Sequence, residues 1–181
     1  MSIRAASAIA AAKSVTTIPH VEATDYAIAR TFVEFLSFSI LFILFFAMIS
    51  AFGLSKFAIP YNPRAIIEFG IIIALFSFGI GLINSFLIAL FPIWKFAWGM
   101  IARIQIFFSA VYFIPEYMVP QVKEIPAYNP IMLFVALFRL GFYPTYPTHF
   151  LSVPYIIGWT CAVLLLGLAL EGPLRDMRIH H

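Results

Sequence analysis

Residues 35–54 read FLSFSILFILFFAMISAFGL and contain no charged side chain. Twenty helical residues at about 1.5 Å each measure about 30 Å, the thickness of the hydrocarbon core of a bilayer. Two further uncharged runs of spanning length follow, at residues 69–94 and 151–170. The chain is therefore predicted to be an integral membrane protein with several transmembrane helices.

The composition agrees with this interpretation. Of the 181 residues, 63% are hydrophobic and 10% are charged, whereas an ordinary soluble domain has roughly 25% charged residues. Mean hydropathy is +1.00. This composition excludes a soluble enzyme, a disordered tail and a disulfide-rich secreted module, because a soluble domain cannot bury so much apolar surface. The net charge of +3 is dispersed without a basic stripe, which argues against a nucleic-acid partner.

The predicted fold is an all-α integral membrane protein with a transmembrane domain at residues 35–170. Four spans are predicted, at about residues 35–54, 69–94, 97–114 and 151–170. The proline-rich stretch 115–150 contains a short apolar run at residues 131–140, which is too short to cross a membrane. We expect 115–150 to form a re-entrant or interfacial helical hairpin that acts as an outer gate, buried in protein or lining a wet cavity.

Four spans leave both termini on one side of the membrane. The terminal side would carry seven basic residues: Arg4, Lys13, Arg30, Lys95, Arg103, Arg175 and Arg178. The other side would carry four: Lys56, Arg64, Lys123 and Arg139. The positive-inside rule then predicts cytoplasmic termini, with residues 1–34 leading into the first span and residues 171–181 forming a cytoplasmic tail.

Four charged residues are candidates for a role in the membrane region. Arg30 and Glu34 are four residues apart and can pair on one helix face, as an interface anchor or as a structural pair inside a bundle. Arg103 is the deepest charge, and it either pairs or snorkels, or lies beside a translocation path. Arg139 ends the short apolar run and can meet an anionic substrate or a lipid headgroup.

Enzymatic motifs are absent from the sequence. It contains no HExxH, GxSxG or Walker-type phosphate loop, so we expect no ATPase activity and no catalytic, metal or cofactor site on this chain. Cys161 is the single cysteine and has no metal-ligand spacing. The carboxylates of Glu116 and Glu124 and the imidazole of His149 are explained by a solvated loop and an interface.

Aromatic residues gather on the predicted outer side, and they admit two interpretations. They are either an interfacial belt or a stacking surface for sugar rings. The residues are Tyr112, Phe113, Tyr117, Tyr128, Phe138, Phe142, Tyr143, Tyr146, Phe150 and Tyr155.

The order of these features resembles the membrane subunit of bacterial type-two ABC exporters for capsular polysaccharide, O-antigen or teichoic acid. One part of the resemblance is Ile18-Pro19-His20-Val21 with Asp25 and then Arg30 and Glu34. A second part runs from Gly79-Ile80-Gly81-Leu82 through Phe91-Pro92 to Arg103. The third comprises Phe113-Ile114-Pro115, Ile125-Pro126, Tyr128-Asn129-Pro130, Arg139 and Gly141-Phe142-Tyr143.

The resemblance implies a mechanism and partners. Two copies of the permease would form a homodimeric pathway in the bacterial inner membrane, and two separate ATP-binding subunits would carry ATP and Mg. The coupling segment, which would contact the ATPase, comprises Ile18, Pro19, His20, Val21 and Asp25. The substrate path or outer gate would comprise Tyr112, Phe113, Tyr117, Tyr128, Asn129, Pro130, Arg139 and Tyr143. The cargo would be a polysaccharide, free or lipid-linked.

The sequence departs from the family pattern at its start. Relatives have an interface helix and two spans before the coupling segment, whereas this sequence begins at that segment. We therefore expect an N-terminally truncated reading frame with four of six spans. The alternatives are an ABC permease for a drug or a lipid, a membrane-embedded enzyme of lipid-linked sugar metabolism, and a structural membrane protein.

Overall fold

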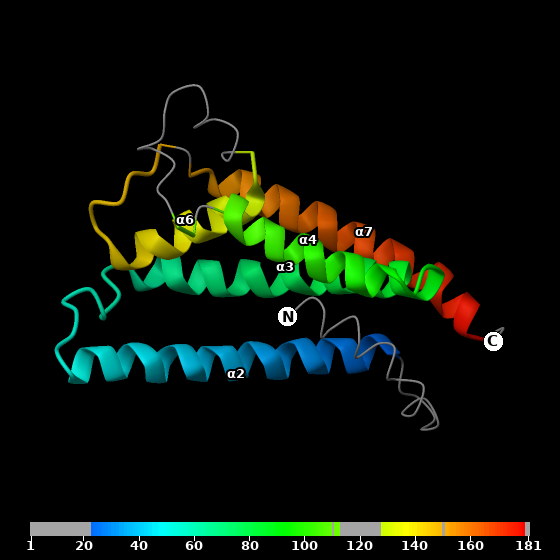
Figure 1. The fold of residues 1–181 in the computed structure, drawn as a ribbon, viewed down its shortest axis with the longest axis horizontal. Coiled ribbons are helices and arrows are strands. Elements are labelled where there is room, and N and C mark those ends of the chain that lie inside the picture. Colours follow the sequence, from blue (N-terminus) through cyan, green and yellow to red (C-terminus); the bar gives the residue numbers. More distant parts are fainter. Residues whose placement is uncertain (1–22, 110, 113–127, 150, 180–181) are drawn as a thin grey trace. The chain divides into compact units, whose positions relative to one another are not determined.

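The computed structural model describes residues 23–109, 111–112, 128–149 and 151–179. The described residues form five helices and no strand. The helices are α2 (Ala23–Ala51), α3 (Pro63–Leu90), α4 (Trp94–Phe108), α6 (Pro130–Phe142) and α7 (Val153–Ile179), as Figure 1 shows. The predicted all-helical class is confirmed for this part of the chain.

Three helices are long and apolar enough to cross a membrane. They are the Ile28–Ala51 part of α2, all of α3, and the Val153–Gly172 part of α7. These segments match the spans predicted at residues 35–54, 69–94 and 151–170. The chain is thus a multi-pass membrane protein by the length and composition of its helices.

The boundaries of the first two spans differ from the prediction for local reasons. α2 continues through Arg30 and Glu34, because these residues pair along the helix and do not interrupt it. α3 begins at Pro63, where the Asn62 side chain accepts a hydrogen bond from the Ala65 backbone N–H at 3.3 Å. α3 ends before Pro92, which cannot continue the helix.

α4 occupies part of the region where the third span was predicted, at residues 97–114. It begins earlier, at Trp94, and has 15 residues, so it is about 22 Å long. It is shorter than the candidate spans, contains Arg103 and has no buried residue. The predicted count of four spans is therefore not confirmed.

The helices form two compact units. The first contains the described residues of Met1–Phe38, Ala74–Ile101 and Thr160–His181, and the second those of Ser39–Ile73 and Ala102–Trp159. In the first unit, α3 and α7 approach closely through glycines. A Cβ built on Gly79 would lie 2.9 Å from the backbone of Leu164, and one on Gly167 would lie 2.8 Å from the carbonyl oxygen of Gly79. Glycine permits this approach because it has no side chain.

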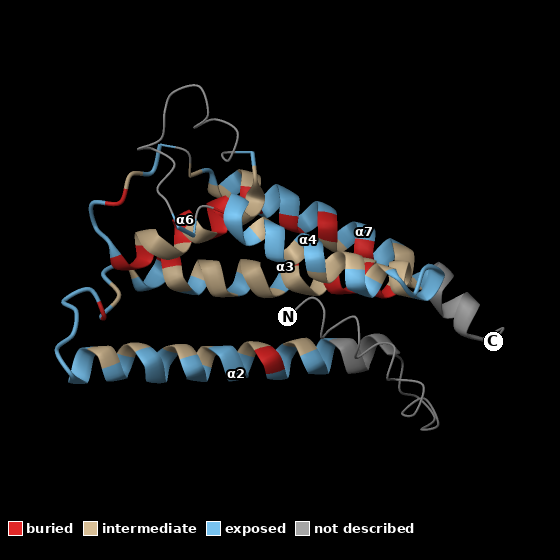
Figure 2. Cartoon of the chain, viewed as in Figure 1, coloured by how far each residue is buried: buried red, intermediate tan, exposed pale blue. Residues whose placement is uncertain are grey.

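The second unit is centred on α6. Met132, Leu133, Phe134 and Leu137 are at most 2% exposed, and Figure 2 shows buried residues along this helix. Six phenylalanine rings from α2, α3 and α6 meet with centroid separations from 4.5 to 6.5 Å. This phenylalanine cluster comprises Phe42, Phe46, Phe69, Phe134, Phe138 and Phe142. It fixes α6 against the C-terminal part of α2 and the N-terminal part of α3 by apolar burial and ring packing.

The surface of α2 is apolar and exposed. Among residues 28–51, only Glu34 is buried, and most of α2 is coloured as exposed in Figure 2. α7 is more exposed on one side than on the other: Thr160, Val163 and Gly167 are buried, whereas the thiol-bearing Cys161 is exposed and free. Exposed apolar helix surface of this extent is expected of helices that contact lipid or other membrane helices.

Candidate functional site

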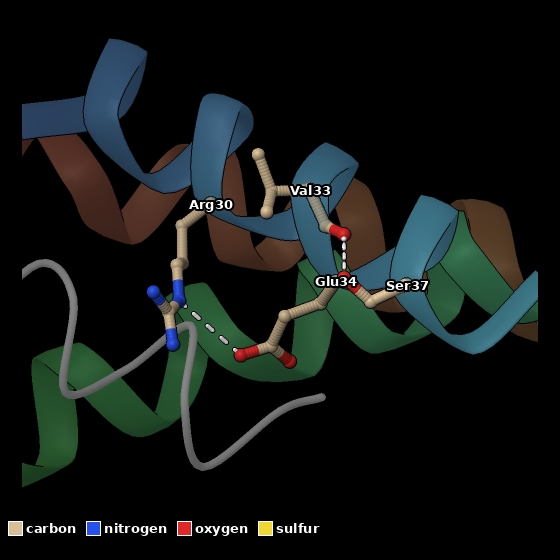
Figure 3. A network of polar contacts seen from close by, with 4 residues as sticks. All are labelled: Arg30, Val33, Glu34 and Ser37. Carbon is tan, nitrogen blue, oxygen red and sulfur yellow. Dashed lines mark hydrogen bonds and ion pairs between the residues drawn. The ribbon is translucent and has the colours of Figure 1, made fainter. Parts of the chain in front are cut away.

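The Arg30–Glu34 pair is the charged site within the first candidate span. Both residues lie on α2, four positions apart, and the Nε of Arg30 lies 3.3 Å from the Oε1 of Glu34 (Figure 3). The Glu34 side chain is 6% exposed and the Arg30 side chain 44%. A buried carboxylate is costly in apolar surroundings unless it is paired, so Arg30 lowers the cost of placing Glu34 there.

A second polar contact follows one turn later. The hydroxyl of Ser37 donates to the carbonyl oxygen of Val33 at 2.8 Å (Figure 3). This bond satisfies the hydroxyl within the helix itself, as is usual for Ser in apolar helices. The predicted pairing of Arg30 with Glu34 is present, whereas their roles as anchor or as bundle pair stay predictions.

Arg103 lies on α4 and is exposed. No ion pair involves Arg103 within the described residues. An exposed arginine can extend along the helix toward water. Its two predicted roles, in pairing or snorkelling and beside a translocation path, both remain predictions.

Three of the predicted gate residues surround the start of α6. The Asn129 Oδ1 accepts from the Ile131 backbone N–H at 3.0 Å, which caps the helix, and Pro130 occupies its first turn. The Asn129 Nδ2 also donates to the carbonyl oxygen of Phe108 at 3.2 Å. The Tyr155 hydroxyl donates to the carbonyl oxygen of Tyr128 at 3.0 Å. The start of α6 is thus joined to the end of α4 and to the start of α7.

Arg139 makes a further connection between α6 and the end of α4. Its Nη2 donates to the carbonyl oxygen of Val111 at 2.7 Å, and its own carbonyl oxygen accepts from the Tyr143 N–H at 2.9 Å. A charged donor gives a strong hydrogen bond. Together, Asn129 and Arg139 bind two carbonyl groups, those of Phe108 and Val111, that lie three residues apart.

The described aromatic residues of the predicted gate have different surroundings. Tyr112 is 73% exposed and its ring lies 6.0 Å from that of Phe107. Tyr143 is 45% exposed and contacts the ring of Phe57 at 5.1 Å. Phe142 and Tyr146, which the sequence places in a belt or a sugar-stacking surface, are at most 9% exposed. Their burial within the protein corrects that assignment, because neither ring is open to lipid or solvent.

The remaining predicted residues cannot be placed in a site. Ile18, Pro19, His20, Val21, Phe113 and Tyr117 lie outside the described residues. Asp25 lies in the first turn of α2. Among the described residues, no group of three or more His, Cys, Asp or Glu side chains could hold a metal ion.

Sequence reasoning missed a hollow beside the end of α6. It has a volume of about 390 Å³ and is lined by Lys56, Phe57, Ile59, Pro60, Tyr61, Phe142 and Pro144. Five of these residues belong to the connection between α2 and α3, in the stretch between the first two predicted spans. No local sequence signal identifies this hollow, because only the fold brings Phe142 and Pro144 to the connection.

Comparisons with known proteins give an informative likeness. No family model matches the chain. The chain is 25% identical over 167 residues to the capsule polysaccharide export inner-membrane protein BexB of Haemophilus influenzae. The matched region covers 92% of this chain and 62% of that protein. The chain thus spans about three fifths of the length of a curated inner-membrane protein to which it is similar.

Proposed function

We propose that this chain is the membrane subunit of an ATP-driven exporter that moves polysaccharide, free or lipid-linked, across the bacterial inner membrane. The observation that supports this proposal best is the similarity to BexB, because it extends over 92% of the chain. The three apolar helices of spanning length agree with such a role. The sequence has no nucleotide-binding motif, so ATP and Mg would be held by a separate ATP-binding subunit.

The roles of the chain's segments belong to the same proposal. Residues 1–34 would contain the coupling segment, with Ile18, Pro19, His20, Val21 and Asp25 at the ATPase. Residues 171–181 would be a cytoplasmic tail, and a second copy of the chain would complete the pathway. Similarity to BexB supports this assignment only at the level of the whole chain.

The stretch from 115 to 150 would form the outer gate through a helix that does not cross the membrane. α6 has 13 residues and is about 20 Å long, too short to span about 30 Å of hydrocarbon. Its polar ends are satisfied within the protein, by Asn129 at the start and by the Tyr143 N–H bond to Arg139 at the end. A buried helix of this kind is compatible with a re-entrant position in the membrane.

Gene deletion combined with measurement of surface polysaccharide tests the transport role. Deletion of the gene should abolish surface polymer and cause polymer to accumulate inside the cell, and the wild-type gene should restore export. Polymer at the surface of the deletion strain in normal amount would refute the proposal. Accumulation of an unmodified lipid-linked sugar precursor would instead favour the alternative that the chain is a membrane-embedded enzyme of lipid-linked sugar metabolism.

Copurification with the ATP-binding subunit tests the coupling segment. His20→Ala and Asp25→Ala should reduce recovery of that subunit without reducing the amount of chain in the membrane. His149→Ala, in the segment before α7, is the matched control and should leave recovery unchanged. If all three variants recovered as much ATP-binding subunit as the wild type, the assignment of the coupling segment would be wrong. The transport role would then still be tested by the export measurement.

Thiol labelling tests the arrangement of spans and the gate. In a Cys161→Ala background, Lys56→Cys, Tyr128→Cys and Pro144→Cys should react with a membrane-impermeant maleimide from outside the inner membrane. Ile93→Cys, in the turn between α3 and α4, should react only after permeabilisation. Labelling of residues 128 and 144 from opposite faces would mean that α6 crosses the membrane.

A further inference from the structure

The hollow between the α2–α3 connection and the end of α6 is constructed by several specific contacts. The Asn62 N–H donates to the carbonyl oxygen of Gly141 at 2.9 Å, which attaches the connection to α6. A side chain at Gly141 would overlap Ile66 of α3 and would lie 3.6 Å from the carbonyl oxygen of Asn62, so the end of α6 packs closely against the start of α3 and the residue before it. The hollow thus has walls from two segments that hydrogen bonding and packing hold together.

The accessible aromatic rings of its lining are those of Phe57, which is 49% exposed, and Tyr61. Phe142 is 3% exposed and its ring stacks on that of Phe46, with centroids 4.5 Å apart and planes 21° apart. The ring centroids of Phe57 and Tyr143 lie 5.1 Å apart, and the Phe57 backbone N–H donates to the Ser55 hydroxyl oxygen at 3.1 Å. Phe142 is thus packed within the phenylalanine cluster, and the ring faces open to a ligand are those of Phe57 and Tyr61.

The lining also contains one positively charged group and one hydroxyl group. Lys56 carries the ammonium group and Tyr61, which is 71% exposed, carries a hydroxyl. Within the described part of the chain, no acidic residue lines the hollow. The hollow therefore combines apolar ring faces, a hydroxyl group and an ammonium group, with no carboxylate among its described lining residues.

This combination fits a carboxylated sugar. Aromatic faces cover the C–H face of a pyranose ring, a tyrosine hydroxyl bonds to sugar hydroxyls, and an ammonium group pairs with a carboxylate. The volume of about 390 Å³ accommodates one or two sugar rings. We infer that the hollow binds an acidic sugar residue of the exported polymer, with Lys56 as the residue that selects for its carboxylate. This inference rests on the proposed export of polysaccharide.

A binding measurement on the chain in nanodiscs of neutral phosphatidylcholine tests the inference. The probe is a tetrasaccharide of alternating hexuronic acid and N-acetylhexosamine, and its carboxyl-reduced form is the matched neutral ligand. The acidic tetrasaccharide should bind more tightly than the carboxyl-reduced one, and added salt should weaken the binding of the acidic form. Lys56→Gln should weaken binding about tenfold, as expected for a charge-assisted pair, whereas Lys56→Arg should retain most of it. Lys95→Gln, at an exposed lysine on α4, is the control and should bind like the wild type.

Amine labelling of the wild-type chain keeps the test decisive if Lys56→Gln fails to fold. The acidic tetrasaccharide should protect Lys56, and not Lys95, from an amine-reactive reagent. Equal binding of the two tetrasaccharides, or equal affinities of Lys56→Gln and Lys95→Gln, would overturn the inference. So would protection of Lys56 by phosphatidylglycerol alone with no effect of the sugar, which would assign the hollow to a lipid headgroup. The binding measurement uses neither ATP nor export, so a negative binding result would overturn only the sugar-binding inference. The proposed transport role is tested separately, by surface polysaccharide in the deletion strain.

Discussion

Replacement of Gly79 or Gly167 by alanine should separate α3 from α7 within the first unit. The new Cβ at position 167 would lie 2.8 Å from the carbonyl oxygen of Gly79 and 3.0 Å from the Cβ of Leu82. At position 79 it would lie 2.9 Å from two backbone atoms of Leu164. Carbon atoms pack best at about 3.5–4.0 Å, so the helices must move apart by roughly 0.6 Å or more.

The cost of this movement follows from the contacts that it weakens. A gap of 0.5–1 Å forfeits about a quarter to a half of the energy of each atom pair, which is about 0.1–0.2 kcal/mol at optimal separation. For about twenty to thirty atom pairs across the contact, the loss is roughly 0.5–3 kcal/mol. This agrees with the approximately 1–3 kcal/mol that insertion of an extra methyl group into a packed core usually costs.

Unfolding in mixed micelles, with sodium dodecyl sulfate as denaturant and circular dichroism as readout, measures the effect. Gly167→Ala should lower the free energy of unfolding by about 1–2 kcal/mol. Gly158→Ala on the same helix is the control, since no atom lies within 4 Å of its Cβ position. It should be neutral or slightly stabilising, because alanine is the better helix former. Equal stability of the two variants would refute the proposed close contact.

Three further substitutions probe other contacts by the same unfolding assay. Arg30→Leu should cost about 1–3 kcal/mol because it removes a charged partner of buried Glu34, whereas the double variant Arg30→Leu/Glu34→Leu should recover much of the loss; a double variant no more stable than the single one would contradict this. Asn84→Ala should cost about 1–2 kcal/mol, since Asn84 is 2% exposed and accepts from the Trp94 indole N–H at 2.8 Å; a loss below about 0.5 kcal/mol would contradict a stabilising role of this bond. Phe134→Ala should cost about 3–5 kcal/mol, because the ring is 1% exposed in the phenylalanine cluster; a loss below about 1 kcal/mol would mean that the cluster rearranges around the cavity.

The sequence was sufficient to predict the features that depend on local hydropathy. Uncharged runs of spanning length predict α2, α3 and α7, because crossing a membrane demands length and apolar composition from each segment separately. The pairing of Arg30 with Glu34 follows from their spacing on one helix. The start of α6 at Asn129-Pro130 also agrees with local capping rules. From the sequence alone, we interpret this pair only as part of the resemblance to the exporter family.

Features that depend on distant contacts could not be predicted in this way. Phe42 and Phe142 are 100 positions apart in sequence, and nothing in either neighbourhood indicates that their rings lie 5.9 Å apart. The same is true of Arg139, whose bond to the Val111 carbonyl oxygen crosses 28 positions. The α4 helix is a different case, since its apolar composition suggested a full span while the described helix has only 15 residues.

The position of Cys161 has a practical consequence for spectroscopy. It is the single thiol of the 181-residue chain, and it points away from the packed side of α7, where Thr160 and Val163 are buried. A nitroxide or a solvatochromic dye can therefore be attached to the wild-type protein without any substitution and without entering the contact with α3. In a bilayer, the accessibility of that nitroxide to oxygen and to a water-soluble nickel chelate would report the depth of α7 directly.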